Sequence, residues 1–392
     1  MTDHQSKIEK LITELCPNGV EIFNLKEVTS IKRGQRVTKS QLKKESKFPV
    51  YSGGVTPMGY FEKANQSANT VTVVKYGTAG FVNFIKEDFW ANDVCYCIKP
   101  NEILNNKYLF YYLKNKQNFI QSQATNAIPA HLPTEAIEKI KIPIPPLAIQ
   151  EEIVKILDSF TELETELETE LEARNTQYVY YRNKLLNIHG VGVEWKTLGE
   201  VANYRRGSFP QPYGENRWYG GKGAMPFVQV ADVGEDMRLV ENTKQKISKL
   251  AQPKSVFVPS GTVIVTLQGS IGRVAVTQYD SYIDRTLAIF ESFKNEINKK
   301  YFAYQLESKF SVEKESARGS TIKTITKEEF TKFKIPIPSV EMQNRIVSTL
   351  DAFNLLLNDI SIGLPAELKA RRQQYEYYRE KLLTFKEKEY AK

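Results

Sequence analysis

The spacing of hydrophobic positions along the chain alternates between stretches that predict helix and stretches that predict strand. Hydrophobic residues three and four positions apart over residues 8–15 predict a helix that ends before Pro17. β-Branched and aromatic runs at residues 71–74 and 81–85, separated by a glycine-rich turn, predict two strands. Helical spacing returns at residues 108–119. This part of the chain is therefore predicted to be globular and to mix both kinds of element.

The second half of the chain repeats this order of elements. Strand-like runs occur at residues 256–258, 263–265 and 274–276, and helical spacing follows at residues 301–310. Each globular part is therefore predicted to be mixed α and β, with more strand than helix.

The sequence Lys-Ile-Pro-Ile-Pro closes each globular part, at residues 141–145 and again at residues 334–338. Because proline fixes φ and disfavours helix in the residue before it, both copies are predicted to be extended exits. A long amphipathic segment follows each exit, and the two segments end on the same residue types. Tyr178, Tyr180, Tyr181, Arg182, Lys184, Leu185 and Leu186 return as Tyr375, Tyr377, Tyr378, Arg379, Lys381, Leu382 and Leu383. A repeat of this length determines the architecture.

Segments upstream of the exits also match. Residues 20–34 resemble residues 193–207, and each segment ends in two basic residues and a glycine. Residues 76–82 resemble residues 268–274 around a glycine-rich turn. The residues between these matches differ strongly. This pattern predicts one frame that carries two different recognition surfaces.

The first amphipathic segment contains Thr-Glu-Leu-Glu three times in succession, at residues 161–172. Four residues turn an α-helix by about 400°, so each unit shifts the leucine stripe by about 40° and lengthens the helix by about 6 Å. The second segment, residues 340–385, lacks this repeat and contains Gly363, Leu364 and Pro365 instead. We expect a break there, with Pro365 near the start of a new helix.

Both helical segments have an apolar seam, so we expect them to pack on each other. Antiparallel pairing after equivalent exits gives a pseudo-two-fold internal repeat and places the globular parts at opposite ends. The predicted fold class is α+β, with two similar mixed α/β domains separated by a two-helix antiparallel coiled coil. The predicted boundaries are residues 1–146 for the first domain with its N-terminal helix, 147–188 for the first helical region, 189–338 for the second domain and 339–392 for the second helical region.

Composition narrows the class of protein. A formal charge of +8 over 392 residues favours a polyanionic partner without proving one. The N-terminal residues are polar, which argues against a signal peptide, and no run of about 18 apolar residues exists, so we expect no membrane span. Three cysteines without a pairing pattern favour a cytoplasmic location.

Catalytic motifs are missing from the sequence. It contains no Asn-Pro-Pro-Tyr or Asp-Pro-Pro-Tyr to hold a flipped adenine, no phosphate-binding glycine loop and no zinc-ligand spacing. Cys95 and Cys97 share one face of a predicted strand, where burial is favoured over metal binding. The charged residues 313–315 are interpreted as a solvated run rather than as part of a nuclease. The sequence therefore predicts a non-catalytic protein that binds no metal or cofactor of its own.

Several residues are candidates for DNA contact, because basic and small polar groups bind phosphates and other polar side chains recognise base edges. They lie at equivalent places in the two halves. These candidates are Lys32, Arg33 and Gly34 with Arg205, Arg206 and Gly207; Tyr76 and Thr78 with Gln268, Ser270 and Arg273; and Asn126 with Arg318, Ser320 and Thr321. Gln229 and Asn92 are weaker candidates for contact with base edges.

Each group of candidates has a structural alternative. The basic pairs are either phosphate contacts or solvated strand ends, and the glycines after them would let a backbone amide approach a phosphate. The glycine-rich turns either lie beside the duplex or are simple hairpin turns. The hydroxyls of Ser320 and Thr321 either cap a helix or bind phosphate at its N-terminus.

The repeated motifs together resemble the specificity subunit of type I restriction–modification systems. The residues that carry the resemblance are Leu-Cys-Pro-Asn-Gly-Val-Glu at residues 15–21, the paired Ile-Pro-Ile-Pro exits, the Gln-x-x-Ile-Val helix starts and the Gln-Tyr-x-Tyr-Tyr-Arg-x-Lys-Leu-Leu helix ends. The resemblance covers nearly the whole chain. It implies two target recognition domains, each recognising one half of a bipartite double-stranded DNA site. It also implies that a tandem repeat in the first helical region sets the length of the spacer between the half-sites.

The resemblance further implies partners. They are two copies of an adenine-N6 methyltransferase subunit that uses S-adenosylmethionine, and restriction subunits with motor and nuclease activity that use ATP and magnesium. The tyrosine and arginine residues at the helix ends either pack in the coiled coil or dock the methyltransferase. Two other hypotheses stay open: a coiled-coil scaffold with two protein-binding domains, and a self-contained methyltransferase, which the missing motifs disfavour.

Overall fold

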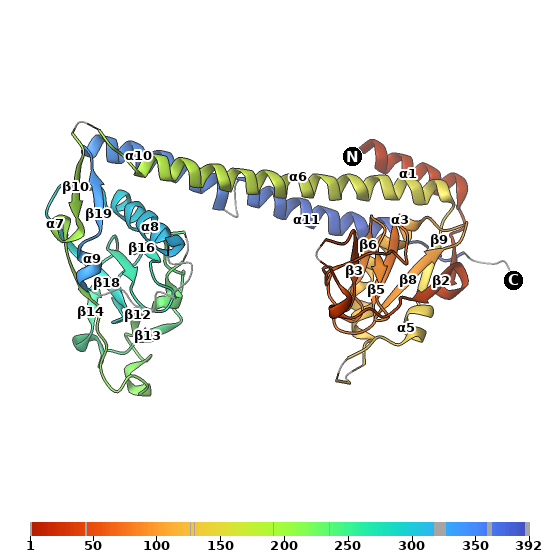
Figure 1. Ribbon diagram of the computed structural model, residues 1–392, viewed down its shortest axis with the longest axis horizontal. Helices are drawn as coiled ribbons and strands as arrows, with labels where there is room; N and C mark the ends of the chain where they lie inside the picture. Colours follow the sequence, from red (N-terminus) through yellow and green to blue (C-terminus); the bar gives the residue numbers. More distant parts are fainter. Residues whose placement is uncertain are drawn as a thin grey trace. The chain divides into compact units, whose positions relative to one another are not determined.

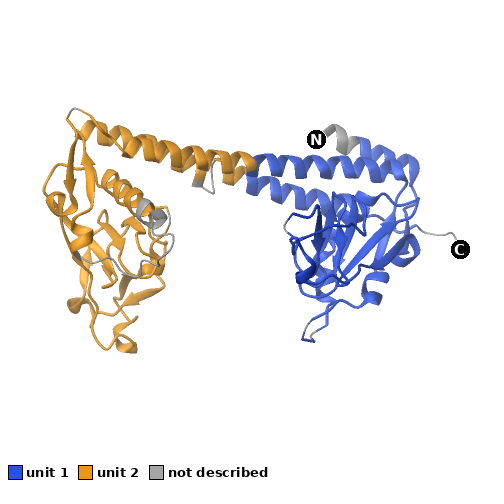
Figure 2. Ribbon diagram, in the orientation of Figure 1, with its two compact units in different colours: residues 1–168, 368–392 blue, residues 169–367 orange. Residues whose placement is uncertain are grey.

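The computed structural model describes residues 2–43, 45–125, 127–128, 130–190, 192–234, 236–316, 327–358 and 363–388 (Figure 1). The predicted candidates Asn126, Arg318, Ser320 and Thr321 lie outside these residues. The chain divides into two compact units (Figure 2). Unit 1 contains residues 1–168 and 368–392, and unit 2 contains residues 169–367.

Unit 1 begins with a helix and continues as a mixed domain. Its elements in chain order are α1 (Thr2–Leu15), β1 (Glu21–Asn24), α2 (Leu25–Val28), β2 (Thr29–Arg33), η1 (Lys39–Gln41), β3 (Phe48–Tyr51), β4 (Tyr60–Phe61), β5 (Thr70–Val74), β6 (Val82–Ile85), β7 (Trp90–Ala91), β8 (Cys95–Pro100), α3 (Asn106–Asn115), α4 (Gln117–Ser122), α5 (Thr134–Glu138) and β9 (Lys141–Ile144). The helix α6 (Leu147–Leu186) follows, and its first part belongs to unit 1.

Unit 2 contains the last part of α6 and the second mixed domain. The elements are β10 (Glu194–Thr197), α7 (Leu198–Val201), β11 (Ala202–Arg206), η2 (Asn216–Trp218), β12 (Met225–Val228), η3 (Val230–Asp232), β13 (Gln245–Ile247), η4 (Gln252–Lys254), β14 (Val256–Val258), β15 (Val263–Thr266), β16 (Val274–Val276), β17 (Ser281–Ile283), β18 (Leu287–Phe293), α8 (Lys299–Ser316), α9 (Lys327–Thr331), β19 (Lys334–Ile337) and α10 (Val340–Asn358). The helix α11 (Gly363–Leu382) begins in unit 2 and continues in unit 1.

The two domains share one sheet topology. In unit 1 the main sheet has the antiparallel order β2-β8-β5-β6, and in unit 2 it has the order β11-β18-β15-β16. A second sheet accompanies each, β4-β3-β7 in unit 1 and β13-β12-β17-β14 in unit 2. Both contain one parallel pair, β3 with β7 and β12 with β17. The predicted duplication is therefore confirmed at the level of topology.

The two exits are strands, and each pairs with the strand that opens its own domain. β9 pairs antiparallel with β1, so that Ile142 lies opposite Phe23. β19 pairs antiparallel with β10, so that Ile335 lies opposite Lys196. These pairings bring the two ends of each domain together, which the extended geometry of the exits alone did not predict.

A buried glutamine joins each domain to the long helix that follows it. Gln150, which is fully buried, donates from Nε2 to the carbonyl oxygen of Pro145 at 2.7 Å and accepts at Oε1 from the amide of Asn105 at 2.7 Å. Gln343 is equally buried and makes the same two contacts, to Pro338 at 2.9 Å and from the amide of Asn298 at 2.8 Å. Each glutamine therefore ties the first turn of α6 or α10 both to the exit strand and to the loop before α3 or α8.

An aspartate about two turns further along each helix completes this connection. Asp158 of α6 accepts from Lys107 Nζ at 2.6 Å and from Tyr111 Oη at 2.7 Å, both on α3. In unit 2, Asp351 accepts from Lys300 and from the Tyr304 hydroxyl on α8 at 2.6 and 2.9 Å. We call the glutamine and aspartate contacts of each unit its junction. Burial and the neighbouring Asp158 raise the pKa of Tyr111, so the phenol keeps the proton that it donates.

The long helices pack antiparallel within each unit. In unit 1, the Phe160 ring on α6 lies 6.1 Å from Tyr375 and 5.7 Å from Tyr378 on α11, between ring centroids. Glu164, further along α6, meets Arg372, which precedes both tyrosines on α11. The opposite directions of the two contacts establish antiparallel packing.

Unit 2 repeats this aromatic contact with the roles of the helices exchanged. Phe353 on α10 lies 6.2 Å from Tyr178 and 6.3 Å from Tyr181 on α6, between ring centroids. Leu186, at the end of α6, packs in a cluster with Leu350, which precedes Phe353. The predicted antiparallel pairing is therefore confirmed in each unit.

The predicted break in the second helical region is also confirmed. α10 ends at Asn358, and α11 begins at Gly363 with Pro365 in its first turn. Gly363 has φ +80°, a left-handed conformation that side chains disfavour. By contrast, α6 is one helix of 40 residues through all three Thr-Glu-Leu-Glu units.

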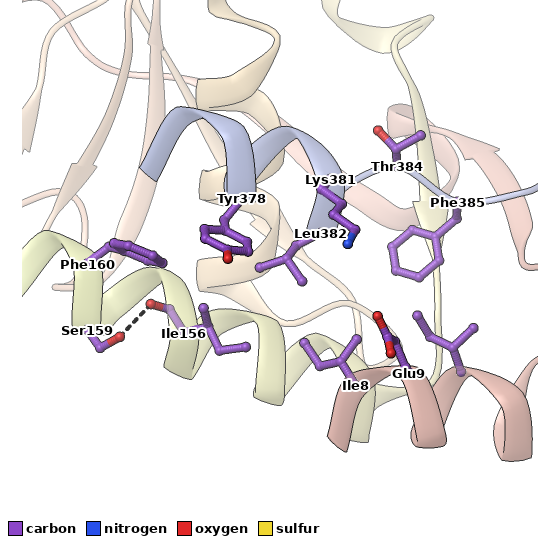
Figure 3. A pocket seen from close by; sticks show the side chains of 11 residues that line it. Ile8, Glu9, Ile156, Ser159, Phe160, Tyr378, Lys381, Leu382, Thr384 and Phe385 are labelled. Atoms are coloured by element: carbon purple, nitrogen blue, oxygen red, sulfur yellow. Dashed lines mark hydrogen bonds between the residues drawn. The ribbon is translucent and has the colours of Figure 1, made fainter. Parts of the chain in front are cut away.

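The N-terminal helix α1 has no counterpart in the described residues of the second half. Lys7 Nζ of α1 lies 2.6 Å from Glu152 Oε2 of α6, whose side chain is buried. An apolar cavity of about 130 Å³ remains between α1, α6 and the end of α11, lined by Ile8, Ile156 and Leu382 among others (Figure 3).

We predict that Gln150→Leu lowers the free energy of unfolding of unit 1 by about 1–3 kcal/mol, because it leaves the partly buried Asn105 amide and the buried Pro145 carbonyl without their partner. The adjacent, exposed Glu151→Leu serves as the control and should change stability little. Denaturant unfolding of the full chain measures both. Equal stability of the two variants would contradict the importance of the junction.

Candidate nucleic-acid interface

Three separate segments of unit 1 meet at one edge of its main sheet. Arg33, at the end of β2, lies opposite Tyr96 of β8. Val74, at the end of β5, lies opposite Cys95, the first residue of β8. The turn after β5 and the loop before β8 therefore lie at the same edge as Arg33. We call this region, and its equivalent in unit 2, the loop edge of the domain.

The loop edge of unit 1 collects basic, aromatic and hydroxyl side chains. Lys32 and Arg33 are both exposed on β2. Tyr76 stacks on His131 with 5.5 Å between ring centroids, and Lys75 Nζ lies 5.2 Å from the centroid of the Tyr76 ring. Burial and the nearby positive charge of Arg33 lower the pKa of Lys75. Among the predicted candidates of this half, Lys32, Arg33 and Tyr76 are therefore brought together at one edge.

Thr78 is exposed in the turn after β5, and its side chain is held by the neighbouring loop. Its Oγ1 donates to the carbonyl oxygen of Gly53 at 3.0 Å, and its amide donates to the same oxygen at 2.9 Å. The hydroxyl oxygen still has a lone pair that can accept a hydrogen bond.

Unit 2 presents the same edge with different side chains. Arg206, at the end of β11, lies opposite Ala288 of β18. Thr266, at the end of β15, lies opposite Leu287 of β18. The exposed Arg206 and the turn that contains Gln268 and Ser270 therefore occupy the places of Arg33, Tyr76 and Thr78. Arg205 is half exposed, and its Nη1 lies 3.8 Å from Glu291 Oε1.

A hydrogen-bond network orders the loop edge of unit 2. Gln229 Nε2 donates to Tyr213 Oη at 2.7 Å, and that hydroxyl donates to Asp284 Oδ2 at 2.7 Å. Asp284 is buried, and its other oxygen accepts from the amide of Thr286 at 2.9 Å. The exposed Arg285 guanidinium lies 5.5 Å from the centroid of the Tyr213 ring. The predicted residue Gln229 thus lies at the same edge as Gln268.

Arg273 is held within its own domain. Its Nη1 donates to the carbonyl oxygen of Val233 at 3.3 Å, and its amide donates to Thr266 Oγ1 at 2.9 Å. The structure therefore gives Arg273 a role in fixing the loops around the edge. Contact of Arg273 with DNA stays a prediction.

The glycine-rich turns are hairpin turns. β5 pairs antiparallel with β6 and β15 with β16 on either side of them. Gly77 and Gly80 have φ +92° and +85°, and Gly269 and Gly272 have φ +69° and +77°. The hairpin interpretation is confirmed, while proximity of these turns to DNA stays a prediction.

Gly34 and Gly207 need correction in one respect. Their amides were expected to be available for a phosphate, but they already donate to Cys95 and Leu287 carbonyls, each at 3.1 Å. A Cβ at Gly34 would lie 2.1 Å from the carbonyl oxygen of Ala91, and one at Gly207 would lie 2.2 Å from that of residue 283. Glycine is required there because two backbone segments approach closely.

Asn92 is likewise structural rather than a base-edge contact. Its side chain is buried, donates to the carbonyl oxygen of Val37 at 3.0 Å and accepts from the amide of the same residue at 3.2 Å.

Several residues of the loop edges were missed by the sequence analysis. Asp93 and Arg285 occupy the same place before β8 and β18, because Asn92 and Asp284 lie against Gly34 and Gly207 in the same way. Lys75, His131 and Tyr213 also belong to these surfaces. An alignment of the two halves could have located these residues. It becomes possible only once β8 and β18 are known to pair with β2 and β11.

The predicted burial of Cys95 and Cys97 is confirmed, at 2% exposure each. Burial raises the pKa of both thiols to about 12. Among the residues that the structure describes, no cluster of three or more histidine, cysteine or acidic side chains is placed to hold a metal ion.

Comparison with known proteins identifies the family. A family model described as the type I restriction modification DNA specificity domain matches residues 17–174 and residues 190–370. The chain belongs to this family. The two matched regions are the two copies of the repeat, so the duplication and the family assignment agree.

Relatives of this specificity subunit have the same extent. A putative type I restriction enzyme specificity subunit from Haemophilus influenzae is 32% identical over 409 residues, covering 98% of this chain and 100% of that protein. The S subunit of a type I restriction–modification system from M. genitalium superposes with a TM-score of 0.57 and 18% identity, covering 93% of this chain and 96% of that one.

A further solved structure supports the fold of the specificity subunit. It comes from a study of complex assembly and conformational transition of the type I restriction–modification system. Its chain superposes with a TM-score of 0.65 and 18% identity, and the match covers 94% of this chain and 98% of that one.

The chain is a DNA specificity subunit, which is the non-catalytic component of such a system. Among its described residues, no helix combines the length and the apolar composition needed to cross a membrane.

We predict that Arg33→Ala weakens DNA binding by the full chain several-fold at moderate salt and reduces the slope of log affinity against log salt concentration by about one. The reason is that Arg33 is predicted to contact one phosphate, which the variant would lose. Lys26→Ala removes an equal charge from α2, at the other end of β2, and serves as the control. Identical salt slopes for both variants would contradict the placement of DNA at this edge.

Proposed function

We propose that each target recognition domain uses its loop edge to recognise one half of a bipartite double-stranded DNA site. This proposal rests on one observation: the two domains share one sheet topology but carry different side chains at equivalent positions of the loop edge. Tyr76 in unit 1 is replaced by Gln268 in unit 2, and Asp93 is replaced by Arg285. Glutamine and arginine favour adenine and guanine edges, whereas a carboxylate favours cytosine. Two such edges would recognise different sequences.

We further propose that α6 sets the spacer between the half-sites through its Thr-Glu-Leu-Glu units. The three units are identical, so deletion of one leaves the same residues after Phe160 for two more units. The contacts of α6 with α11 in unit 1 would therefore survive a change in repeat number. The change would instead alter the length of α6 between Phe160, which belongs to unit 1, and Tyr178, which belongs to unit 2.

The helix ends offer a docking surface for a partner that binds twice. Of the three tyrosines in each copy, two pack around Phe160 or Phe353. The third is 61% exposed in both copies, at Tyr180 and Tyr377. Exposed tyrosines at equivalent positions fit repeated binding of one partner surface.

The proposed partners are two methyltransferase subunits and, through them, restriction subunits, in a cytoplasmic complex on DNA. The partners would supply S-adenosylmethionine, ATP and magnesium chemistry. The specificity subunit would contribute recognition and spacing only.

We predict that deletion of residues 161–164 shortens the preferred spacer by one or two base pairs, since about 6 Å of helix corresponds to about two steps of 3.4 Å along DNA. Methylation of a library of sites with different spacers, by the complex with its methyltransferase, measures the shift. The half-site sequences should stay the same. Methylation of the original spacer at an unchanged rate would contradict the proposal.

If the exposed tyrosines dock the methyltransferase, each substitution should reduce the number of bound methyltransferase subunits by one. Tyr180→Ala and Tyr377→Ala should each weaken one of two methyltransferase sites by about 2 kcal/mol, the typical value for an aromatic residue at the centre of an interface. The double variant should weaken both sites. Tyr60→Ala removes another exposed tyrosine, on β4, as the control. Native mass spectrometry at graded concentrations reports the stoichiometry, and full assembly by the double variant would contradict docking here.

A further inference from the structure

The Thr-Glu-Leu-Glu units create a packing problem for α6. Because each unit shifts the leucine stripe by about 40°, three units carry it about 120° around the helix, away from any straight partner. Phe160, just before the repeat, is buried at 4% exposure. Leu163, Leu167 and Leu171 are only partly buried. Apolar contact is therefore weaker along the repeat than before it.

Arg372 of α11 meets the repeat where this weakening begins. Its Nε donates to Glu164 Oε1 at 2.6 Å, and its Nη2 donates to Glu168 Oε1. The two carboxylates are the last residues of the first and second units. They lie four residues apart and therefore on one side of the helix. One guanidinium thus holds two successive repeat units.

The planar guanidinium makes this contact sensitive to position. Its donors have a fixed geometry, so both carboxylates are reached together only at one rotation and one register of α6 against α11. Leu368, one turn earlier on α11, is buried, so α11 is packed close to this contact.

We propose that Arg372 is a positioning residue for the spacer, because it fixes the register of α6 against α11 along the repeat. This inference rests on the proposed function of α6 and assigns that function to a particular side chain. Without Arg372, the repeat would lose the ion pairs at Glu164 and Glu168, while its leucines are only half-buried. The helix pair would then accept neighbouring registers, and the complex would accept neighbouring spacers.

The test uses the full specificity subunit in complex with its methyltransferase and the library of spacer lengths. Arg372→Gln should raise methylation of the neighbouring spacers, relative to the preferred one, by about three- to tenfold, the scale expected for two exposed ion pairs. The preferred half-site sequences should not change. Arg372→Lys keeps the positive charge but lacks the planar array of guanidinium donors, so its preference among spacer lengths should be intermediate.

Glu172→Gln is the matched control, because Glu172 has the same place in the third unit and is not one of the two carboxylates that Arg372 holds. It should leave the spacer profile unchanged. The triple variant Arg372→Glu, Glu164→Arg, Glu168→Arg exchanges the charges and should restore much of the selectivity.

The outcomes separate this inference from the proposed function. If deletion of residues 161–164 shifts the spacer while Arg372→Gln keeps the original profile, Arg372 has no positioning role and the repeat still sets the spacer. If neither change has an effect, both ideas are wrong. Equal broadening by Glu172→Gln and Arg372→Gln would show that loss of any charged side chain near the repeat has this effect, and would overturn the inference.

Discussion

The structure depends on the junction between each recognition domain and the helix that leaves it. A glutamine side chain with no exposure to solvent satisfies a loop amide and an exit-strand carbonyl at once, in both halves of the chain. Unsatisfied polar groups at such a site would cost about 1–3 kcal/mol each, so the arrangement strongly favours one orientation. The aspartate contacts of Asp158 and Asp351 add a second point of attachment. With two separated attachments, the domain cannot rotate about its helix, whereas a single attachment would permit that rotation.

Because each domain is attached to its helix in the same way, the side chains of its loop edge can differ without changing how the edge is presented. Each domain keeps the strands, the exit and the junction, while the side chains at the end of the main sheet change. A specificity subunit needs this separation of roles, because a new target sequence must not disturb the geometry that presents it. The close approach at Gly34 and Gly207 belongs to the constant part, and Tyr76 and Gln268 belong to the variable part.

Local signals in the sequence were sufficient for much of the fold. Hydrophobic periodicity located α1, β5, β15 and both long helices, and Pro365 marked the start of α11 because proline is tolerated in a first helical turn. The duplication was visible in the matched motifs. Pairing of the exits with β1 and β10 was not predicted, because it joins residues more than a hundred positions apart and leaves no local pattern.

Site residues were predicted less completely than the fold. The basic pairs and the glycine-rich turns were located, since both recur in register. The role of Gly34 was misjudged. A required glycine indicates that another group approaches the backbone closely, but it does not show whether that group is a DNA phosphate or a neighbouring backbone segment. Tyr213 and His131 were missed, because their positions depend on loops that differ between the halves.

Hydrogen exchange at the junctions tests the central claim most directly. Amides of Asn105 and Asn298 lie in short loops, yet each donates to a buried glutamine. If the junctions hold each domain to its helix, these two amides should exchange as slowly as the hydrogen-bonded amides of the buried Gln150 and Gln343. Exchange of either amide at the rate of an open loop would contradict the account.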